Sequence, residues 1–285
     1  MSMAVLLDGK AMAAEMTEAL KGRVDALRAK GCTPGLAVIL VGDDPASRIY
    51  VQSKEKACAA LGIYSETHCL PADTKQEALE GLIGKLNQND RVSGILVQLP
   101  LPKGLDEAKA LLCIAPEKDV DGFHIENAGR LFTGRRGVVP CTPKGILYML
   151  KKANVPLAGR EAVVVGRSNL VGKPVAQLLL QENCTVAQCH SKTADLAAHT
   201  KRADILVCAV GKPRFITADM VKPGAAVIDV GINRVDGRVI GDVDFGAVES
   251  VAGYISPVPG GVGKMTIVML MENTVEAAER RASAL

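Results

Sequence analysis

The chain has 285 residues, of which 48% are hydrophobic and 23% are charged, and its formal net charge is +3. This length allows two domains with buried cores, and the balance of residue types is that of an ordinary globular protein. The small net charge and the lack of a basic run argue against a nucleic-acid partner. No apolar stretch reaches the roughly 18 residues of a membrane span, so we expect no membrane partner.

The cysteines and the first residues indicate a reducing compartment. The eight cysteines are scattered and none forms a Cys-x-x-Cys pair, which favours core thiols over disulfides or a zinc site. The four histidines show no metal-binding spacing, so we expect no metal. The first residues lack a cationic region and a cleavage-like site, so we expect no export signal and a cytoplasmic location.

The first half of the chain alternates between helical and strand-like patterns. Apolar residues recur at helical spacing from Lys10 to Lys30, and Thr74–Glu77 matches a capping box at the start of a later helix. The other expected elements are a strand at Leu36–Val41, a helix from Asp44-Pro45 to Leu61, and strands at Ile63–Leu70 and Gly94–Leu99. This alternation predicts an α/β fold with a parallel sheet.

The second half repeats the alternation after an irregular segment. Residues Ala115–Cys141 are rich in glycine and charge and indicate an interdomain passage. A helix capped by Thr142-Pro143 is expected next, ending near Lys152. Further strands are expected near residues 162–166, 184–189, 204–208 and 226–230, and a last helix at Lys264–Ala282. The two alternating series predict two α/β domains.

The most informative segment is Ala162–Pro174. A β-branched apolar run leads into a loop that contains Gly166 and Gly172, and a helical pattern follows. Glycine lets the backbone approach a pyrophosphate, and the first turn of the helix offers N–H groups to the anion. The spacing is not G-x-G-x-x-G, so a plain strand–loop–helix connection stays open as the alternative.

The end of the next strand favours NADP over NAD. NAD sites carry an Asp or Glu about 20 residues after the glycines. Here His190–Thr193 supplies hydroxyls and basic groups, and Arg167 lies in the loop itself. Such groups donate hydrogen bonds to a 2′-phosphate, which a carboxylate would repel. The alternative is that they only solvate a turn.

Four further patterns are candidate sites, each with an ordinary structural alternative. Tyr50 and Lys54 share a helix face at a spacing that suits acid/base work, although spacing alone favours a surface lysine beside a half-buried tyrosine. Gln98 ends a buried strand, where ligands of parallel sheets bind, or is a satisfied core amide. Asp121 precedes a glycine, which is typical of a turn, yet a carboxylate there can also grip an amidine-like ring edge. The glycine-rich Pro257–Gly263 either admits a planar ligand or is a rigid connector.

Seven segments together resemble the bifunctional methylenetetrahydrofolate dehydrogenase/methenyltetrahydrofolate cyclohydrolase family, in family order and over most of the chain. The segments are Tyr50–Cys58, Gly94–Pro102, Pro116–His124, Pro140–Pro143, Val165–Pro174, Cys189–Ser191 and Pro257–Thr266. The resemblance implies NADP-dependent oxidation of 5,10-methylenetetrahydrofolate to 5,10-methenyltetrahydrofolate, then hydrolysis to 10-formyltetrahydrofolate. It implies tetrahydrofolate interconversion in one-carbon metabolism, with purine biosynthesis downstream. A monofunctional NAD-linked dehydrogenase and a non-enzymatic nucleotide sensor of the same fold are the alternatives.

The resemblance also implies roles for individual residues. The catalytic and folate-binding residues would be Tyr50, Lys54, Gln98 and Asp121. Lys54 would act beside the one-carbon bridge, with Gln98 favouring its neutral form; Tyr50 would stack on the folate and help orient the amine, and Asp121 would anchor the pterin edge. The NADP-binding residues would be Gly166, Arg167, Ser168, Gly172, Ser191 and Ile232, with Arg167 and Ser191 on the 2′-phosphate. Pro259, Gly260 and Gly261 would close over the folate, although Lys264 stands where the family usually has proline.

The same resemblance implies two α/β domains with the active site in the cleft between them. Residues 1–140 and the helix at 264–285 would form the N-terminal folate-binding and catalytic domain. Residues 141–263 would form a Rossmann-like domain that binds the dinucleotide. The implied partners are the folate substrate and a second copy of the chain, in a homodimer formed through the nucleotide-binding domain.

Overall fold

The computed structural model describes residues 3–283, which divide into two compact units. The six-strand unit comprises residues 3–14 and Thr142–Thr266, and the three-strand unit comprises Glu15–Cys141 and residues 267–283. Both units are α/β structures with parallel sheets, which confirms the predicted fold class. Within residues 3–283, no helix combines the length and the apolar character that crossing a membrane requires.

The six-strand unit is built on one parallel sheet. Its strands are β1 (Val5–Leu6), β5 (Glu161–Val165), β6 (Thr185–Cys189), β7 (Ile205–Cys208), β8 (Ala226–Asp229) and β11 (Tyr254–Ile255), in the order β1-β11-β8-β7-β5-β6. The chain leaves β5 for β6 on one side and reaches β7 on the other, so the strand order reverses beside β5. Ligands of such sheets bind at this reversal, beyond the carboxyl ends of the strands.

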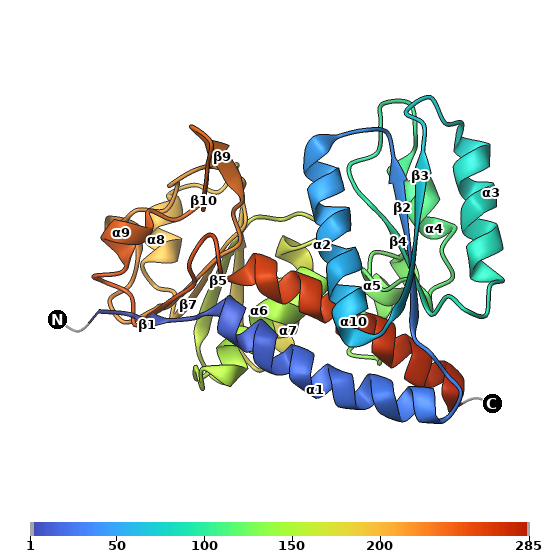
Figure 1. The fold of residues 1–285 in the computed structure, drawn as a ribbon. Helices are drawn as coiled ribbons and strands as arrows, with labels where there is room; N and C mark the ends of the chain where they lie inside the picture. Colours follow the sequence, from blue (N-terminus) through green and yellow to red (C-terminus); the bar gives the residue numbers. More distant parts are fainter. Residues whose placement is uncertain (1–2, 284–285) are drawn as a thin grey trace. The chain divides into compact units, whose positions relative to one another are not determined.

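Short helices and one hairpin complete this unit (Figure 1). The helical elements are α6 (Cys141–Lys152), α7 (Gly172–Gln181), α8 (Leu196–Thr200), the 3₁₀ turn η1 (Ala218–Met220) and α9 (Phe245–Val248). The hairpin pairs β9 (Asn233–Val235) with β10 (Arg238–Ile240) in antiparallel register. Helix α7 packs against β5 and β6, so the loop that precedes α7 lies at the carboxyl ends of these strands.

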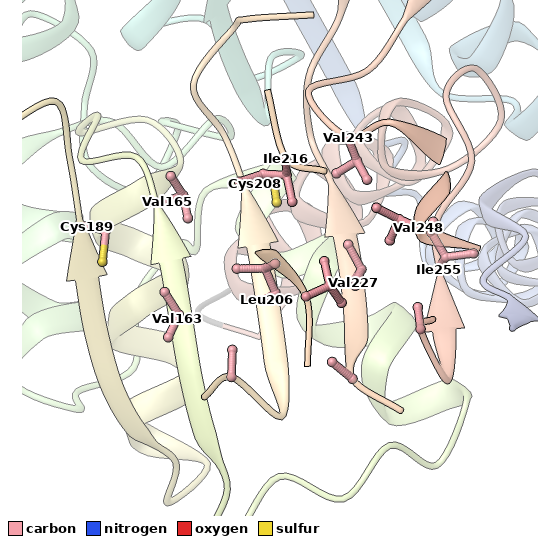
Figure 2. Close-up of a cluster of buried hydrophobic side chains, with 14 residues drawn as sticks. Val163, Val165, Cys189, Leu206, Cys208, Ile216, Val227, Val243, Val248 and Ile255 are labelled. Carbon is pink, nitrogen blue, oxygen red and sulfur yellow. The ribbon is translucent and has the colours of Figure 1, made fainter. Parts of the chain in front are cut away.

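A cluster of buried side chains forms the core on one face of this sheet. Figure 2 labels Val163, Val165, Cys189, Leu206, Cys208, Ile216, Val227, Val243, Val248 and Ile255. Residues two apart in a strand point to the same face, which is why Val163 and Val165 both belong to the cluster. Ile216 and Val243 form an isolated parallel bridge, which joins two loops at the carboxyl ends of the strands.

The three-strand unit has its own parallel sheet in the order β3-β2-β4. Its elements are β2 (Gly35–Val41), α2 (Pro45–Leu61), β3 (Tyr64–Leu70), α3 (Gln76–Asn87), β4 (Gly94–Val97), α4 (Glu107–Leu112) and α5 (Ile125–Phe132). Alternate residues of β2 pack in one buried cluster with Leu79, Ile83 and Leu86 of α3. Figure 1 shows α2 and α3 on opposite sides of this sheet. The central strand β2 is buried along its whole length, as the continuous apolar run predicted.

Two long helices belong to both units by sequence. Helix α1 (Gly9–Ala29) begins in the six-strand unit and continues into the three-strand unit after Ala14. Helix α10 (Val262–Ala282) does the same after Thr266. Residues 3–14 group with the six-strand unit because β1 pairs with β11, whereas the predicted division places them with residues 15–140.

Some local predictions differ from the structure. The capping box at Thr74 is wrong, because α3 is preceded by Lys75 without a side-chain cap and the Thr74 hydroxyl donates to the Pro71 carbonyl. Thr142-Pro143 does not cap α6, which already begins at Cys141. The segment Ala115–Cys141, expected to be irregular, contains α5. The β9–β10 hairpin and the two-residue strands β1 and β11 were not predicted.

Candidate active site

Helix α2 positions Tyr50 and Lys54. The Asp44 carboxylate accepts a hydrogen bond from the Ser47 N–H at 2.7 Å, and Gly62 ends the helix in the left-handed conformation. These two signals fix the ends of α2, as predicted, and therefore the position of each residue along the helix. Tyr50 lies one turn before Lys54 and is 40% exposed, whereas Lys54 is partly buried.

Gln98 lies at the carboxyl end of β4 and contacts the Lys54 amine. The Gln98 N–H continues the sheet by donating to the Ile39 carbonyl at 2.9 Å. Its side-chain amide donates to the Leu99 carbonyl at 2.8 Å, and its Oε1 atom accepts from Lys54 Nζ at 2.8 Å. Because the amide nitrogen is already engaged by Leu99, the amide oxygen is the atom that faces the lysine.

Burial and a nearby carboxylate act in opposite directions on Lys54. Desolvation lowers the pKa of Lys54 below its ordinary value, and the charge of Asp121 opposes this change. Burial likewise raises the pKa of Asp121, while the positive charge of Lys54 lowers it. A neutral acceptor such as Gln98 stabilises the charged amine less than a carboxylate would, so this contact counters the effect of burial on the pKa of Lys54 only weakly.

Asp119 shapes the loop that carries Asp121, a role the sequence analysis did not assign. Its side chain is 1% exposed and accepts hydrogen bonds from the N–H groups of Gly122, Phe123 and His124. The Asn127 amide adds a fourth donor at 2.9 Å. The two carboxylates of this loop therefore differ: Asp119 accepts hydrogen bonds from its own loop and from Asn127 of α5, and Asp121 interacts electrostatically with Lys54.

Asn273 of α10 holds the same loop from a distant part of the sequence. Its amide donates to the Val120 carbonyl at 2.8 Å and to the Val139 carbonyl at 3.0 Å. Asn273 is 1% exposed. A single polar residue inside a largely buried helix has no local signal, because its partners lie more than a hundred residues earlier in the chain.

The loop after β5 has the shape of a phosphate cradle. Gly166 has φ of 135°, and a Cβ atom there would lie 2.3 Å from the Ala209 carbonyl oxygen. A Cβ atom on Gly172 would lie 2.4 Å from the Gly166 carbonyl oxygen. The Ser168 hydroxyl accepts from the N–H groups of Val171 and Gly172, which orders the turn into α7. Only glycine fits at both positions, as expected where a backbone approaches a pyrophosphate closely.

The other predicted dinucleotide residues lie beyond the carboxyl ends of the same sheet. Arg167 and Ser191 are exposed after β5 and β6, and Ile232 is 51% exposed after β8. The first carboxylate after β6 is Asp195, and its side chain accepts from the Ala198 N–H as the cap of α8. The end of β6 therefore presents hydroxyl and basic groups, which suit a 2′-phosphate. Across residues 3–283, no group of three or more His, Cys, Asp and Glu side chains is arranged to hold a metal ion.

The loop with Pro259, Gly260 and Gly261 belongs to the six-strand unit, whereas Tyr50, Lys54, Gln98 and Asp121 belong to the three-strand unit. The start of α1 holds this loop, because the Lys10 N–H donates to the Gly260 carbonyl at 2.9 Å. The exposed Lys264 lies in the first turn of α10, and its N–H donates to the Gly261 carbonyl at 3.1 Å. Proline, which lacks this N–H, could not make the same bond.

Comparisons with known proteins agree on one family. The family model "Tetrahydrofolate dehydrogenase/cyclohydrolase, catalytic domain" matches residues 7–121, and "Tetrahydrofolate dehydrogenase/cyclohydrolase, NAD(P)-binding domain" matches residues 140–282. A curated relative from Dechloromonas aromatica, named "Bifunctional protein FolD", is 58% identical over 280 residues. The alignment covers 98% of this chain and 99% of that relative.

Solved structures that resemble this chain belong to the same family. The FolD methylenetetrahydrofolate dehydrogenase/cyclohydrolase of Campylobacter jejuni has a TM-score of 0.97 at 49% identity, covering 98% of this chain and 99% of that one. The enzyme of Trypanosoma brucei, solved with NADP cofactor and an inhibitor, has a TM-score of 0.94 at 41% identity and covers 99% of both chains. With 58% identity to a curated relative and two family models over most of its length, the chain belongs to the tetrahydrofolate dehydrogenase/cyclohydrolase family.

Proposed function

We propose that the protein oxidises 5,10-methylenetetrahydrofolate with NADP⁺ and hydrolyses the resulting 5,10-methenyltetrahydrofolate to 10-formyltetrahydrofolate. The observation that carries this proposal is the hydrogen bond from Lys54 Nζ to Gln98 Oε1 at 2.8 Å, in a chain of this family. Lys54 is thus a partly buried amine whose pKa is lowered by burial, and its hydrogen-bond partner Gln98 is neutral. A cationic methenyl group tolerates a neutral amine beside it and would be repelled by an ammonium.

In the hydrolytic step, Lys54 acts on water. The neutral amine has one lone pair and two N–H groups, and Gln98 Oε1 accepts a hydrogen bond from one of these N–H groups. The lone pair then takes a proton from the water that attacks the methenyl carbon, so a C–O bond forms and Lys54 becomes charged. The bond from this carbon to N5 then breaks and its electron pair goes to N5, which takes the proton back from the charged Lys54. The carbinol O–H releases its proton to solvent as the C=O bond forms, which leaves the formyl group on N10 and Lys54 neutral again. Asp121 stabilises the transient ammonium and anchors the aminopyrimidine edge of the pterin.

In the oxidative step, residues of the six-strand unit hold the dinucleotide. NADP⁺ supplies the hydride acceptor when it is bound. The glycines of the cradle after β5 let the backbone approach the pyrophosphate, while Arg167 and Ser191 donate to the 2′-phosphate. Gly172 opens α7, whose first N–H groups favour an anion. Ile232 gives an apolar surface beyond β8.

Two assays on the purified protein test this proposal. With methylenetetrahydrofolate and NADP⁺, absorbance should report the reduced dinucleotide, and NAD⁺ should support a lower rate. Separately, methenyltetrahydrofolate should lose its absorbance faster than in buffer alone. Folded protein that lacks both activities would refute the proposal, and equal rates with NAD⁺ and NADP⁺ would refute the assignment of Arg167 and Ser191.

We also propose a cytoplasmic homodimer whose product supplies purine biosynthesis, as the family resemblance implies. All eight cysteines are free thiols, which suits a reducing compartment. Strand β6 lies at one edge of its sheet, so its outer backbone groups are available to a second copy of the chain. Light scattering should give twice the mass of one chain, and a mass equal to a single chain would contradict the dimer.

A further inference from the structure

One buried carboxylate gathers the loop that follows β7. The Asp242 side chain is fully buried and accepts hydrogen bonds from three consecutive backbone N–H groups, those of Val210, Gly211 and Lys212, at 2.6, 2.9 and 2.9 Å. The Asn233 amide donates to the same carboxylate at 2.9 Å. Three successive N–H groups around one anion form a concave nest, and here a side chain of the protein occupies it.

A second buried carboxylate holds Asp242 in place. Asp229, at the end of β8, accepts from the N–H groups of Gly231, Asp242 and Val243, each at 2.9 Å. A Cβ atom on Gly241 would lie 1.8 Å from Asp229 Oδ2, and one on Gly231 would lie 2.2 Å from Asp242 Oδ1. The glycines at 231 and 241 therefore make room for the two carboxylates.

The loop held by Asp242 lies beside the phosphate cradle. The Ala209 N–H donates to the Val165 carbonyl at 2.8 Å, which extends the pairing of β7 and β5 by one residue. The Ala209 carbonyl oxygen is the atom that leaves no room for a side chain on Gly166. Val243, the residue after Asp242, reaches the same end of the strands in Figure 2. Asp242 thus fixes backbone that directly adjoins the first turn of the cradle.

From this geometry we infer that Asp242, held by Asp229, is a positioning residue for the dinucleotide. It sets the course of Val210–Lys212 after β7 and, through Asn233, of the hairpin after β8. Both segments lie beyond the carboxyl ends of the strands, where dinucleotides bind to sheets of this kind. The inference rests on the proposed binding of NADP⁺ at these strand ends.

The substitution Asp242→Asn tests the inference because it keeps the size of the side chain. An amide offers one oxygen to four donors and turns an N–H group toward them, so the loop should loosen. We expect faster hydrogen exchange of the amides at 210–212 and an NADP⁺ dissociation constant about tenfold higher by titration calorimetry. Faster exchange with unchanged NADP⁺ affinity would overturn the inference, as would unchanged exchange in the folded variant.

The control is Asp204→Asn, which lies just before β7, at the amino ends of the strands of the same sheet. The Asp204 carboxylate also accepts a backbone N–H, from Glu161 at 3.0 Å, and pairs with Lys222 at 2.7 Å. This variant should bind NADP⁺ as the wild type does, and an equal loss in both variants would reveal general destabilisation and overturn the inference. Failure of the wild-type protein to bind NADP⁺ would instead refute the proposed function.

A milder variant covers the case in which Asp242→Asn does not fold. Asn233→Ala removes one of the four donors to Asp242 and leaves the three backbone N–H groups in place. It should raise the NADP⁺ dissociation constant by a smaller factor and speed exchange at 210–212. A folded Asn233→Ala protein with unchanged exchange and affinity would then overturn the inference.

Discussion

Replacing Gln98 by glutamate would put a carboxylate where the amide oxygen now lies, 2.8 Å from Lys54 Nζ. Coulomb's law at this separation gives an attraction of roughly 6 kcal/mol for an effective dielectric constant of about 20. Desolvation of the new charge offsets part of this energy, and an opposite charge this close typically favours the charged lysine by about 10- to 1000-fold. The pKa of Lys54, which burial lowers in the wild-type protein, should therefore rise in Gln98→Glu.

Cyclohydrolase activity of Gln98→Glu at neutral pH should fall, by up to about 1000-fold, because a higher pKa lowers the neutral fraction of Lys54. The sign follows from the mechanism: the active form is unprotonated, so a higher pKa moves the rise in activity to higher pH. The control is Gln98→Met, which is similar in length and uncharged, and which should lower the rate without that movement. The assay is the pH–rate profile of methenyltetrahydrofolate hydrolysis, corrected for the buffer rate. Superimposable profiles of the two variants would refute the reasoning.

Three further substitutions test the assigned roles. Lys54→Met should lower cyclohydrolase activity by at least about 100-fold in a protein of unchanged melting temperature, and persistent hydrolysis would remove Lys54 from the reaction. Asp121→Asn removes a charge that raises the pKa of Lys54, so the rise in the hydrolysis profile should move to lower pH; movement to higher pH would contradict the assigned interaction. Arg167→Ala should weaken NADP⁺ binding by about 10- to 100-fold and leave NAD⁺ binding unchanged in titration calorimetry, whereas equal losses would place Arg167 away from the 2′-phosphate.

Elements with local signals at both ends were predictable. Helix α2 has a capping aspartate, a proline in its first turn and a terminal glycine, and its bounds are confirmed. The β9–β10 hairpin has a signal as well, since Asp236-Gly237 is a favoured two-residue turn, but its strands have three residues each and are too short to show an alternating pattern. Strands β1 and β11 have two residues each, so their pairing depends on the rest of the sheet. Thr74 matches the capping pattern, yet its hydroxyl donates to the Pro71 carbonyl and Lys75 precedes α3 without a side-chain cap.

The candidate site was predictable only in its residue types. Position along the chain could not bring Lys54 and Gln98 together, because they are 44 residues apart; the family resemblance linked them. Sequence could not separate Asp119 from Asp121 either, since the difference lies in which backbone N–H groups each carboxylate meets. Asp229 and Asp242 carried no recognisable motif, because their partners are loops that only the folded sheet brings together.

Helices α1 and α10 pass from one unit to the other, so each unit consists of two separate stretches of sequence. A cut near residue 141 would leave the downstream fragment without β1, and so without the strand that borders β11. The same cut would take Asn273 away from the loop that presents Asp121. Neither the six-strand unit nor the three-strand unit is thus one uninterrupted stretch of the natural chain. Separating the two activities should therefore use substitutions of single side chains or a circular permutation of the sequence.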